Sequence, residues 1–139
     1  MQIQEVFDRR RFVFLDGGMG TQLQQRGLQP GQKPELAALE MPDVLTAIHR
    51  DYTAAGADIL YFETFTDLYE MKAALLAAKE NSTLPIMASM SFEANGRTFT
   101  GCTVESFAAT ARGLGANAVG INCSLGPKEI FPMAKRLAE

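Results

Sequence analysis

The chain of 139 residues contains two cysteines, one histidine and no tryptophan. Two cysteines without an apolar leader segment speak against the disulfide framework of small secreted domains. Cys102, Cys123 and His49 also fall short of the four ligands of a structural zinc site, and their spacing matches no closed zinc motif. We therefore predict neither a disulfide scaffold nor a self-contained zinc module.

Long apolar runs and clustered positive charge are missing as well. No stretch of about 18 apolar residues is present, and the N-terminal segment lacks the apolar region of a signal peptide. The formal net charge is −3, and the only basic cluster is Arg9–Arg11, which fits the solvated end of a helix. A nucleic-acid surface would need a broad basic stripe. We predict a cytoplasmic protein with no nucleic-acid partner and no membrane partner.

The overall composition is that of an ordinary globular chain. Apolar residues make up 47% and charged residues 21% of the sequence, close to the averages of roughly 45–50% and about 25% for globular proteins. The length suits one domain over residues 1–139 with a real core. It is too short for a complete eight-fold barrel, which takes about 250 residues.

Short apolar runs alternate with helical segments along the whole chain. The runs lie at 12–15, 57–62, 84–90 and 118–122. The helical patterns lie at 21–26, 42–55, 67–80, 104–114 and from 128 onwards. Apolar strands that alternate with helices indicate a parallel sheet covered by helices. The pattern predicts an α/β fold of about four parallel βα units, half of a TIM-type barrel.

Polar side chains occur where the apolar runs end: Asp16, Glu63, Ser89 or Ser91, and Asn122 with Cys123. In parallel α/β folds the reacting groups gather at the carboxyl ends of the strands. Two carboxylates such as Asp16 and Glu63 could hold a substrate ammonium group. An equally good interpretation is that Asp16 caps the following turn and Glu63 is simply exposed.

The two cysteines have alternative interpretations on pattern alone. Cys123 follows a glycine-containing run and precedes a Ser-Leu-Gly-Pro loop, so it could be a thiolate ligand or a nucleophile. An unpartnered cysteine also serves as a small buried apolar residue. Cys102 fits a structural loop position, and His49 fits a surface or packing residue inside a helix.

Five motifs, in this order along the chain, resemble the homocysteine S-methyltransferase family. They are Leu15-Asp-Gly-Gly-Met-Gly-Thr21, Pro34-Glu-Leu36 with Pro42-Asp-Val-Leu-Thr-Ala-Ile-His49, Tyr52-Thr-Ala-Ala-Gly-Ala-Asp58, Phe62-Glu-Thr-Phe65 and Gly120-Ile-Asn-Cys-Ser124. The resemblance covers almost the whole chain. It is strongest to the homocysteine-binding N-terminal module of cobalamin-dependent methionine synthases.

The resemblance implies a barrel that transfers a methyl group to the thiol of homocysteine and so yields methionine. In the family three cysteines hold a zinc ion, and metal coordination keeps the homocysteine sulfur deprotonated. Cys123 matches the first of these zinc ligands. Asp16 and Glu63 match the carboxylates that hold the homocysteine amino group, with Gly17, Gly18 and Asn122 as further substrate-binding residues.

The sequence also departs from the family pattern. The family's second strand is normally followed by a third, but here Gly56-Ala-Asp-Ile59 passes directly into Leu60-Tyr-Phe-Glu-Thr64 of the fourth. We expect an internal deletion and a C-terminal truncation that removes the other two zinc ligands. One thiolate cannot fix a catalytic zinc, which usually has three protein ligands.

Two functions follow from this comparison of motifs. The first is the family's methyl transfer to homocysteine, impaired by the missing zinc ligands. The alternative is a non-catalytic half-barrel scaffold, truncated or engineered. In either case a four-unit sheet leaves its strand edges open, which motivates the hypothesis that two copies close a barrel as a homodimer.

Overall fold

The computed structural model describes residues 3–139. These residues form two compact units. The sheet unit combines the N-terminal segment up to Phe12 with Ile59–Glu139, and the helical unit is Val13–Asp58. Each unit has its own apolar core, so each is described by itself.

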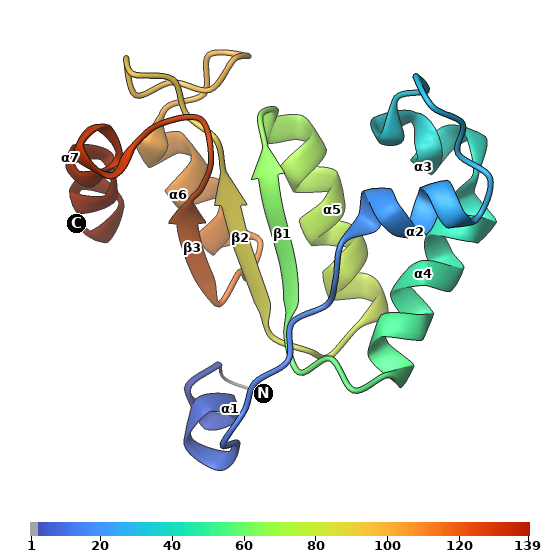
Figure 1. Cartoon of the computed structure of the whole chain (residues 1–139). Helices are drawn as coiled ribbons and strands as arrows, with labels where there is room; N and C mark the ends of the chain where they lie inside the picture. Colours follow the sequence, from blue (N-terminus) through green and yellow to red (C-terminus); the bar gives the residue numbers. More distant parts are fainter. Residues whose placement is uncertain (1–2) are drawn as a thin grey trace. The chain divides into compact units, whose positions relative to one another are not determined.

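A three-stranded parallel sheet is the centre of the sheet unit (Figure 1). Its strands are β1 (Leu60–Phe65), β2 (Ile86–Met90) and β3 (Ala118–Ile121). Its helices are α1 (Ile3–Arg9), α5 (Leu68–Asn81), α6 (Val104–Gly113) and α7 (Pro127–Ala138). The strand order is β1-β2-β3, so neighbours in the sheet are also neighbours in the sequence. Successive βα units arranged side by side are the building plan of a barrel, and they confirm the predicted α/β class with parallel strands.

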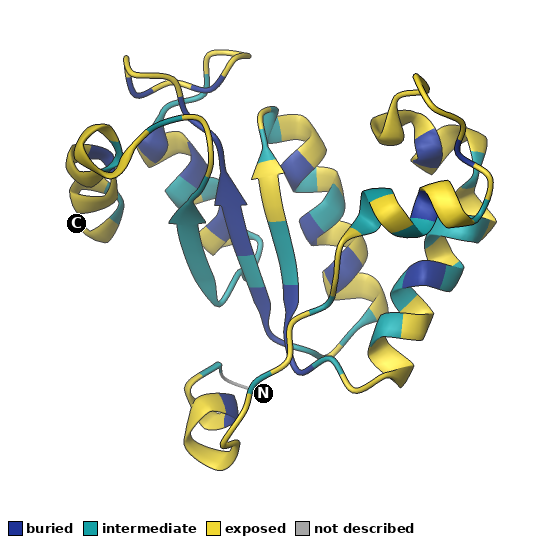
Figure 2. Cartoon of the chain, in the orientation of Figure 1, coloured by how far each residue is buried: buried dark blue, intermediate teal, exposed yellow. Residues whose placement is uncertain are grey.

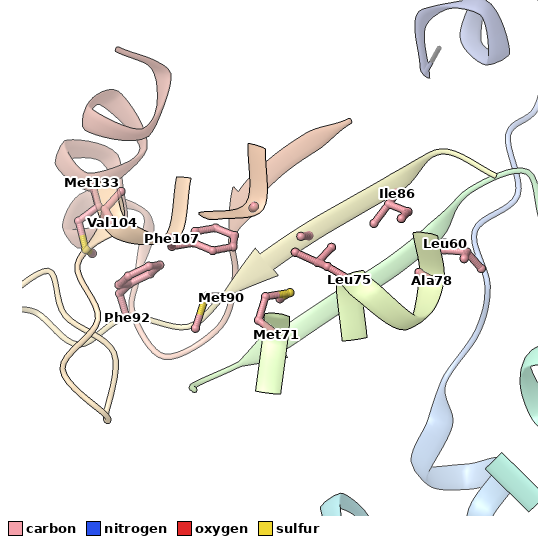
Figure 3. Packing of buried hydrophobic residues seen from close by; sticks show 12 residues of the cluster. Leu60, Met71, Leu75, Ala78, Ile86, Met90, Phe92, Val104, Phe107 and Met133 are labelled. Atoms are coloured by element: carbon pink, nitrogen blue, oxygen red, sulfur yellow. The ribbon is translucent and has the colours of Figure 1, made fainter. Parts of the chain in front are cut away.

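One face of the sheet carries the apolar core. Its buried side chains come from β1 and β2, from the segment after β2, and from the helices α5, α6 and α7 (Figure 3). They are Leu60, Met71, Leu75, Ala78, Ile86, Ala88, Met90, Phe92, Val104, Phe107, Ala111 and Met133. Because successive strand residues point to opposite faces, Tyr61, Met87 and Ala118 form a row on the other face. None of these three side chains belongs to the core cluster.

Side-chain caps fix where two of the helices begin. The Asp67 carboxylate accepts a hydrogen bond from the Glu70 amide at 2.9 Å, at the start of α5. The Thr103 hydroxyl accepts one from the Ser106 amide at 3.2 Å, at the start of α6. Each cap satisfies an amide that has no partner within the helix. The strand-to-helix connections therefore end at defined residues, close to the carboxyl ends of the strands.

The helical unit contains α2 (Met19–Gln25), the 3-10 turn η1 (Pro34–Leu36), α3 (Ala37–Glu40) and α4 (Pro42–Ala54). Its core is small: Leu23, Leu28, Ala37 and Ile48. Pro42 occupies the first turn of α4, where a missing amide proton costs nothing. An ion pair between Arg26 and Asp51, 2.6 Å long, links the end of α2 to α4. In Figure 2 the buried positions of this unit are few and most of its surface is exposed.

The predicted helices over 42–55, 67–80 and 104–114 are confirmed to within one residue at each end. The strand predicted at 57–62 lies at 60–65 instead. Gly56 has a φ of +100°, which ends α4 with a turn and delays the strand. The strand then continues through the polar residues Glu63 and Thr64, which the apolar pattern did not include.

The strand predicted at 12–15 is wrong, and the sheet has three strands where four were predicted. Only Leu15 of this run takes part in a bridge. The backbone of Phe14 pairs with a single residue instead: its amide donates to the Asp58 carboxylate at 3.1 Å, and its carbonyl accepts from the Asp58 amide at 2.7 Å. Phe12, Phe14 and Leu15 all have exposed side chains. A run this short becomes a strand only where a ladder pairs with it.

Between residues 3 and 139, no helix has the length and apolar character needed to cross a membrane.

Candidate functional site

The carboxyl ends of the three strands meet at one edge of the sheet, because parallel strands share their direction. Glu63 and Thr64 lie near the end of β1, Ser89 lies in β2, and Asn122 and Cys123 directly follow β3. Glu63 and Cys123 are exposed, whereas Ser89 is buried. The structure therefore brings together the predicted residues Glu63, Asn122 and Cys123 at one edge of the sheet unit.

The Asn122 side chain is the centre of a hydrogen-bond network at this edge. Its oxygen Oδ1 accepts from the Ser89 hydroxyl at 2.7 Å and from the Thr64 amide at 3.1 Å. Its nitrogen Nδ2 donates to Thr64 Oγ1 at 2.7 Å and to Cys123 Sγ at 3.3 Å. All the acceptors and donors of one amide are thus used, and they connect the ends of all three strands.

The network continues along the sheet face opposite the core cluster. The Tyr61 hydroxyl and Ser89 Oγ lie 3.0 Å apart. Since the single Ser89 proton is directed at Asn122, Tyr61 donates to Ser89. The Ser91 hydroxyl donates to the main-chain carbonyl of Asn122 at 3.0 Å. A polar network in which every member has a partner holds its members in one arrangement.

The backbone at this edge is unusual. Thr64, Cys123 and Ser124 have φ values of +66°, +60° and +53°, and no other non-glycine residue of the described chain has a positive φ. The pairing of β1 with β2 also shifts register between Phe62 and Phe65. Positive φ values are rare for residues with a side chain, above all for a β-branched threonine, and they cluster at functional sites.

The two cysteines have different surroundings. Cys123 is exposed, with Asn122 Nδ2 and Thr64 Oγ1 beside its sulfur at 3.3 and 3.7 Å. Cys102 is half-buried and donates to the Thr103 carbonyl at 3.3 Å. Burial raises the pKa of the Cys102 thiol, and the backbone hydrogen bond at Phe107 opposes that shift. Cys102 is therefore a poor source of a thiolate.

The residues present do not fit a zinc ion. Within residues 3–139 no group of three or more His, Cys, Asp or Glu side chains is arranged to hold a metal. Cys123 makes its contacts to Thr64 and Asn122, neither of which is a thiolate or an imidazole. A catalytic zinc site usually requires three protein ligands.

The other predicted residues, Asp16, Gly17 and Gly18, lie in the loop before α2 of the helical unit. Asp16 is half-buried, and both glycines are exposed. A Cβ on Gly17 would lie 2.5 Å from Cε1 of Tyr52. The Tyr52 hydroxyl donates to the Gly18 carbonyl at 2.9 Å. The loop conformation thus depends on a tyrosine from α4 that packs against a residue without a side chain.

Sequence reasoning missed three residues that support these loops: Tyr52, Tyr61 and Thr64. Tyr61 alternates with Glu63 in β1, so the alternation of polar and apolar residues was a usable signal for it. Thr64 directly follows Glu63 and breaks this alternation. Tyr52 had no such signal, because it fits the apolar face of a helix. Its contact with Gly17 joins two segments that are distant in the sequence.

The sequence profile of the family described as homocysteine S-methyltransferase matches residues 13–61 and 54–139. The chain belongs to this family. The two matches overlap at residues 54–61, and the boundary between the helical and sheet units, after Asp58, lies inside the overlap.

Curated relatives include two methionine synthases. The methionine synthase of Mycobacterium tuberculosis is 29% identical over 136 residues, which is 94% of this chain and 11% of that protein. The methionine synthase of Mycobacterium leprae is 27% identical over 140 residues, again covering 11% of the relative. The chain therefore spans about a tenth of the length of these relatives.

Solved structures of the family show a similar fold. The apo form of the homocysteine methyltransferase MmuM from Escherichia coli superposes with a TM-score of 0.57 at 23% identity, covering 96% of this chain and 57% of the other. The metallated form gives a TM-score of 0.61 at 21% identity, covering 98% and 62%. At this identity the likeness concerns the fold.

Proposed function

We propose that this chain binds homocysteine at the carboxyl edge of its sheet, as a reduced form of the family's methyltransferase domain. The observation that carries the proposal is the exposed pair of Glu63 and Cys123 at the edge that the Asn122 network organises. A carboxylate suits the homocysteine ammonium group through a charge-assisted hydrogen bond. By the resemblance of their motif, Asp16, Gly17 and Gly18 of the helical unit are proposed as further substrate-binding residues.

Methyl transfer to the homocysteine thiol, giving methionine, is the activity proposed by family membership. We expect it to be impaired, because Cys123 would be the only thiolate at a zinc site and no group of three or more His, Cys, Asp or Glu side chains in residues 3–139 is arranged to hold a metal. The alternative proposal is a non-catalytic half-barrel scaffold, truncated or engineered. It is favoured by the same shortage of ligands and needs nothing beyond the fold.

The family matches that overlap at 54–61 support an internal deletion that joins two pieces of one barrel domain over residues 1–139. In this proposal three βα units are formed, residues 13–58 correspond to a fourth, and a second copy completes the barrel. A cytoplasmic location agrees with the proposed chemistry, since a free thiolate needs reducing surroundings.

The test measures zinc per chain and the Kd for L-homocysteine on one preparation purified under reducing conditions. We expect less than stoichiometric zinc and weak homocysteine binding. Glu63→Gln should weaken binding by about tenfold, because it replaces a charge-assisted hydrogen bond of about 1.5–3 kcal/mol by a neutral one of about 0.5–1.5 kcal/mol. The matched control is Glu80→Gln, an exposed glutamate in the last turn of α5, which should bind like the unmodified chain.

Two outcomes would change the proposal. Failure of the unmodified chain to bind homocysteine would leave the scaffold as the better description. Stoichiometric zinc that disappears in Cys123→Ser but persists in Cys102→Ser would show that further ligands are recruited. That result would favour a complete methyltransferase.

A further inference from the structure

We infer that Asn122 is a positioning residue: it locks Thr64 in the left-handed conformation and thereby sets the directions of Glu63 and Cys123. The inference rests on the proposed homocysteine site. It replaces the expectation that Asn122 binds the substrate itself and adds Thr64 as its partner.

The first observation is the two-point contact between Asn122 and Thr64. The amide of Thr64 donates to Oδ1 at 3.1 Å, while Nδ2 donates to Thr64 Oγ1 at 2.7 Å. The side-chain amide of Asn122 therefore forms hydrogen bonds with both the backbone and the side chain of Thr64, which lies 58 positions away in the sequence. A paired contact of this kind fixes orientation as well as distance.

The second observation is the local distortion of β1. The register shift between Phe62 and Phe65 and the φ of +66° at Thr64 place an irregularity next to Glu63. Such irregularities in strands redirect a neighbouring side chain. A threonine stays in this conformation only where its surroundings hold it there, and the Asn122 amide provides that hold.

The third observation is that the hydrogen-bonding groups of the Asn122 side chain are all occupied by neighbouring residues. Oδ1 has two donors, and Nδ2 gives its two protons to Thr64 Oγ1 and Cys123 Sγ. No proton of Nδ2 is left for an amino-acid ligand. The group at the edge that remains exposed and charged is Glu63, which agrees with a supporting role for Asn122.

The experiment combines homocysteine affinity with amide hydrogen exchange in the full chain. The variants are Asn122→Ala, Thr64→Val, the double variant and Thr64→Ser, which keeps the hydroxyl. The matched control is Thr66→Val, an exposed threonine two residues further on whose side chain takes no part in the lock. Thermal melting of each variant confirms that it folds.

We expect the exchange of the Thr64 amide to rise at least about tenfold in Asn122→Ala. Homocysteine affinity should fall by about tenfold in Asn122→Ala and by less in Thr64→Val, which removes only the contact between Nδ2 and Oγ1. The double variant should lose no more than Asn122→Ala alone, because Asn122→Ala already removes that contact. Thr64→Ser and Thr66→Val should keep both the exchange rate and the affinity.

Additive losses in the double variant would mean that Asn122 contacts the substrate directly, which overturns the inference. Unchanged Thr64 exchange in Asn122→Ala overturns it as well, whatever the homocysteine result. If the unmodified chain binds no homocysteine, the proposed function fails separately. The exchange of the Thr64 amide then decides on the lock alone.

Discussion

Individual residues of the candidate site differ in whether the backbone position tolerates a side chain. Thr64 and Cys123 accept a left-handed backbone that glycine would adopt more readily. Gly17, in contrast, has no room for a side chain, since a Cβ there would lie 2.5 Å from the Tyr52 ring. The chain thus uses side chains where hydrogen bonds hold the backbone, and glycine where an aromatic ring covers it.

The close contact at Gly17 leads to a stability prediction. Gly17→Ala should destabilise the helical unit by about 1–3 kcal/mol, the usual cost of overpacking, because the new methyl group must displace the Tyr52 ring. Urea denaturation followed by circular dichroism measures the change.

The control is Gly20→Ala, since a Cβ at Gly20 meets nothing within 4 Å and the residue lies inside α2. Alanine is the better helix former by about 1 kcal/mol, so Gly20→Ala should be neutral or stabilising. Equal denaturation midpoints for Gly17→Ala and the unmodified chain would show that the ring moves at no cost.

At the scale of elements, the turn chemistry decides where each strand gives way to a helix. Asp67 and Thr103 cap α5 and α6 with their side-chain oxygens. The start of β1 was not visible in the sequence. Asp58 lies in the apolar run that predicted the strand, but its carboxylate binds the Phe14 amide instead.

Thr103→Ala should destabilise the sheet unit by about 1 kcal/mol, because the Ser106 amide loses its acceptor at the start of α6. Thr103→Ser keeps an oxygen in the same place and should restore most of the loss. The midpoint of urea denaturation reports both variants. A Thr103→Ala midpoint equal to that of the unmodified chain would show that water replaces the cap fully.

At the scale of the whole molecule, the proposed homodimer would use the sheet face opposite the core cluster and the outer edges of the three-stranded sheet. Tyr61, Met87 and Ala118 form the row that lies outside the core cluster. An unpaired strand edge pairs readily with another chain. This arrangement supports the proposal that two half-barrels associate.

We expect light scattering to show a concentration-dependent dimer. Met87→Lys should abolish it, because a charged group would be buried between the two copies without a partner. Met87 is half-buried and outside the core cluster, so the monomer should tolerate the lysine. The control is Lys72→Met on α5, which changes the charge in the opposite direction and should leave the dimer intact. A monomer at every concentration would contradict the closed-barrel proposal.

The sequence by itself determined the α/β class, the main helices and the residue types at the strand ends. These features depend on local periodicity, caps and the order of motifs along the chain. Glu63, Asn122 and Cys123 could be placed at one edge because parallel strands share their carboxyl ends.

Only the tertiary structure decided the conformation of residues 12–15, the register of β1 and the hydrogen-bond partners of Asn122. Each depends on a contact between segments far apart in the chain: Phe14 with Asp58, and Thr64 with Asn122. Local patterns state which backbone conformations are favourable. They do not state which distant side chain will satisfy a given amide, and at these positions that partner determined the conformation.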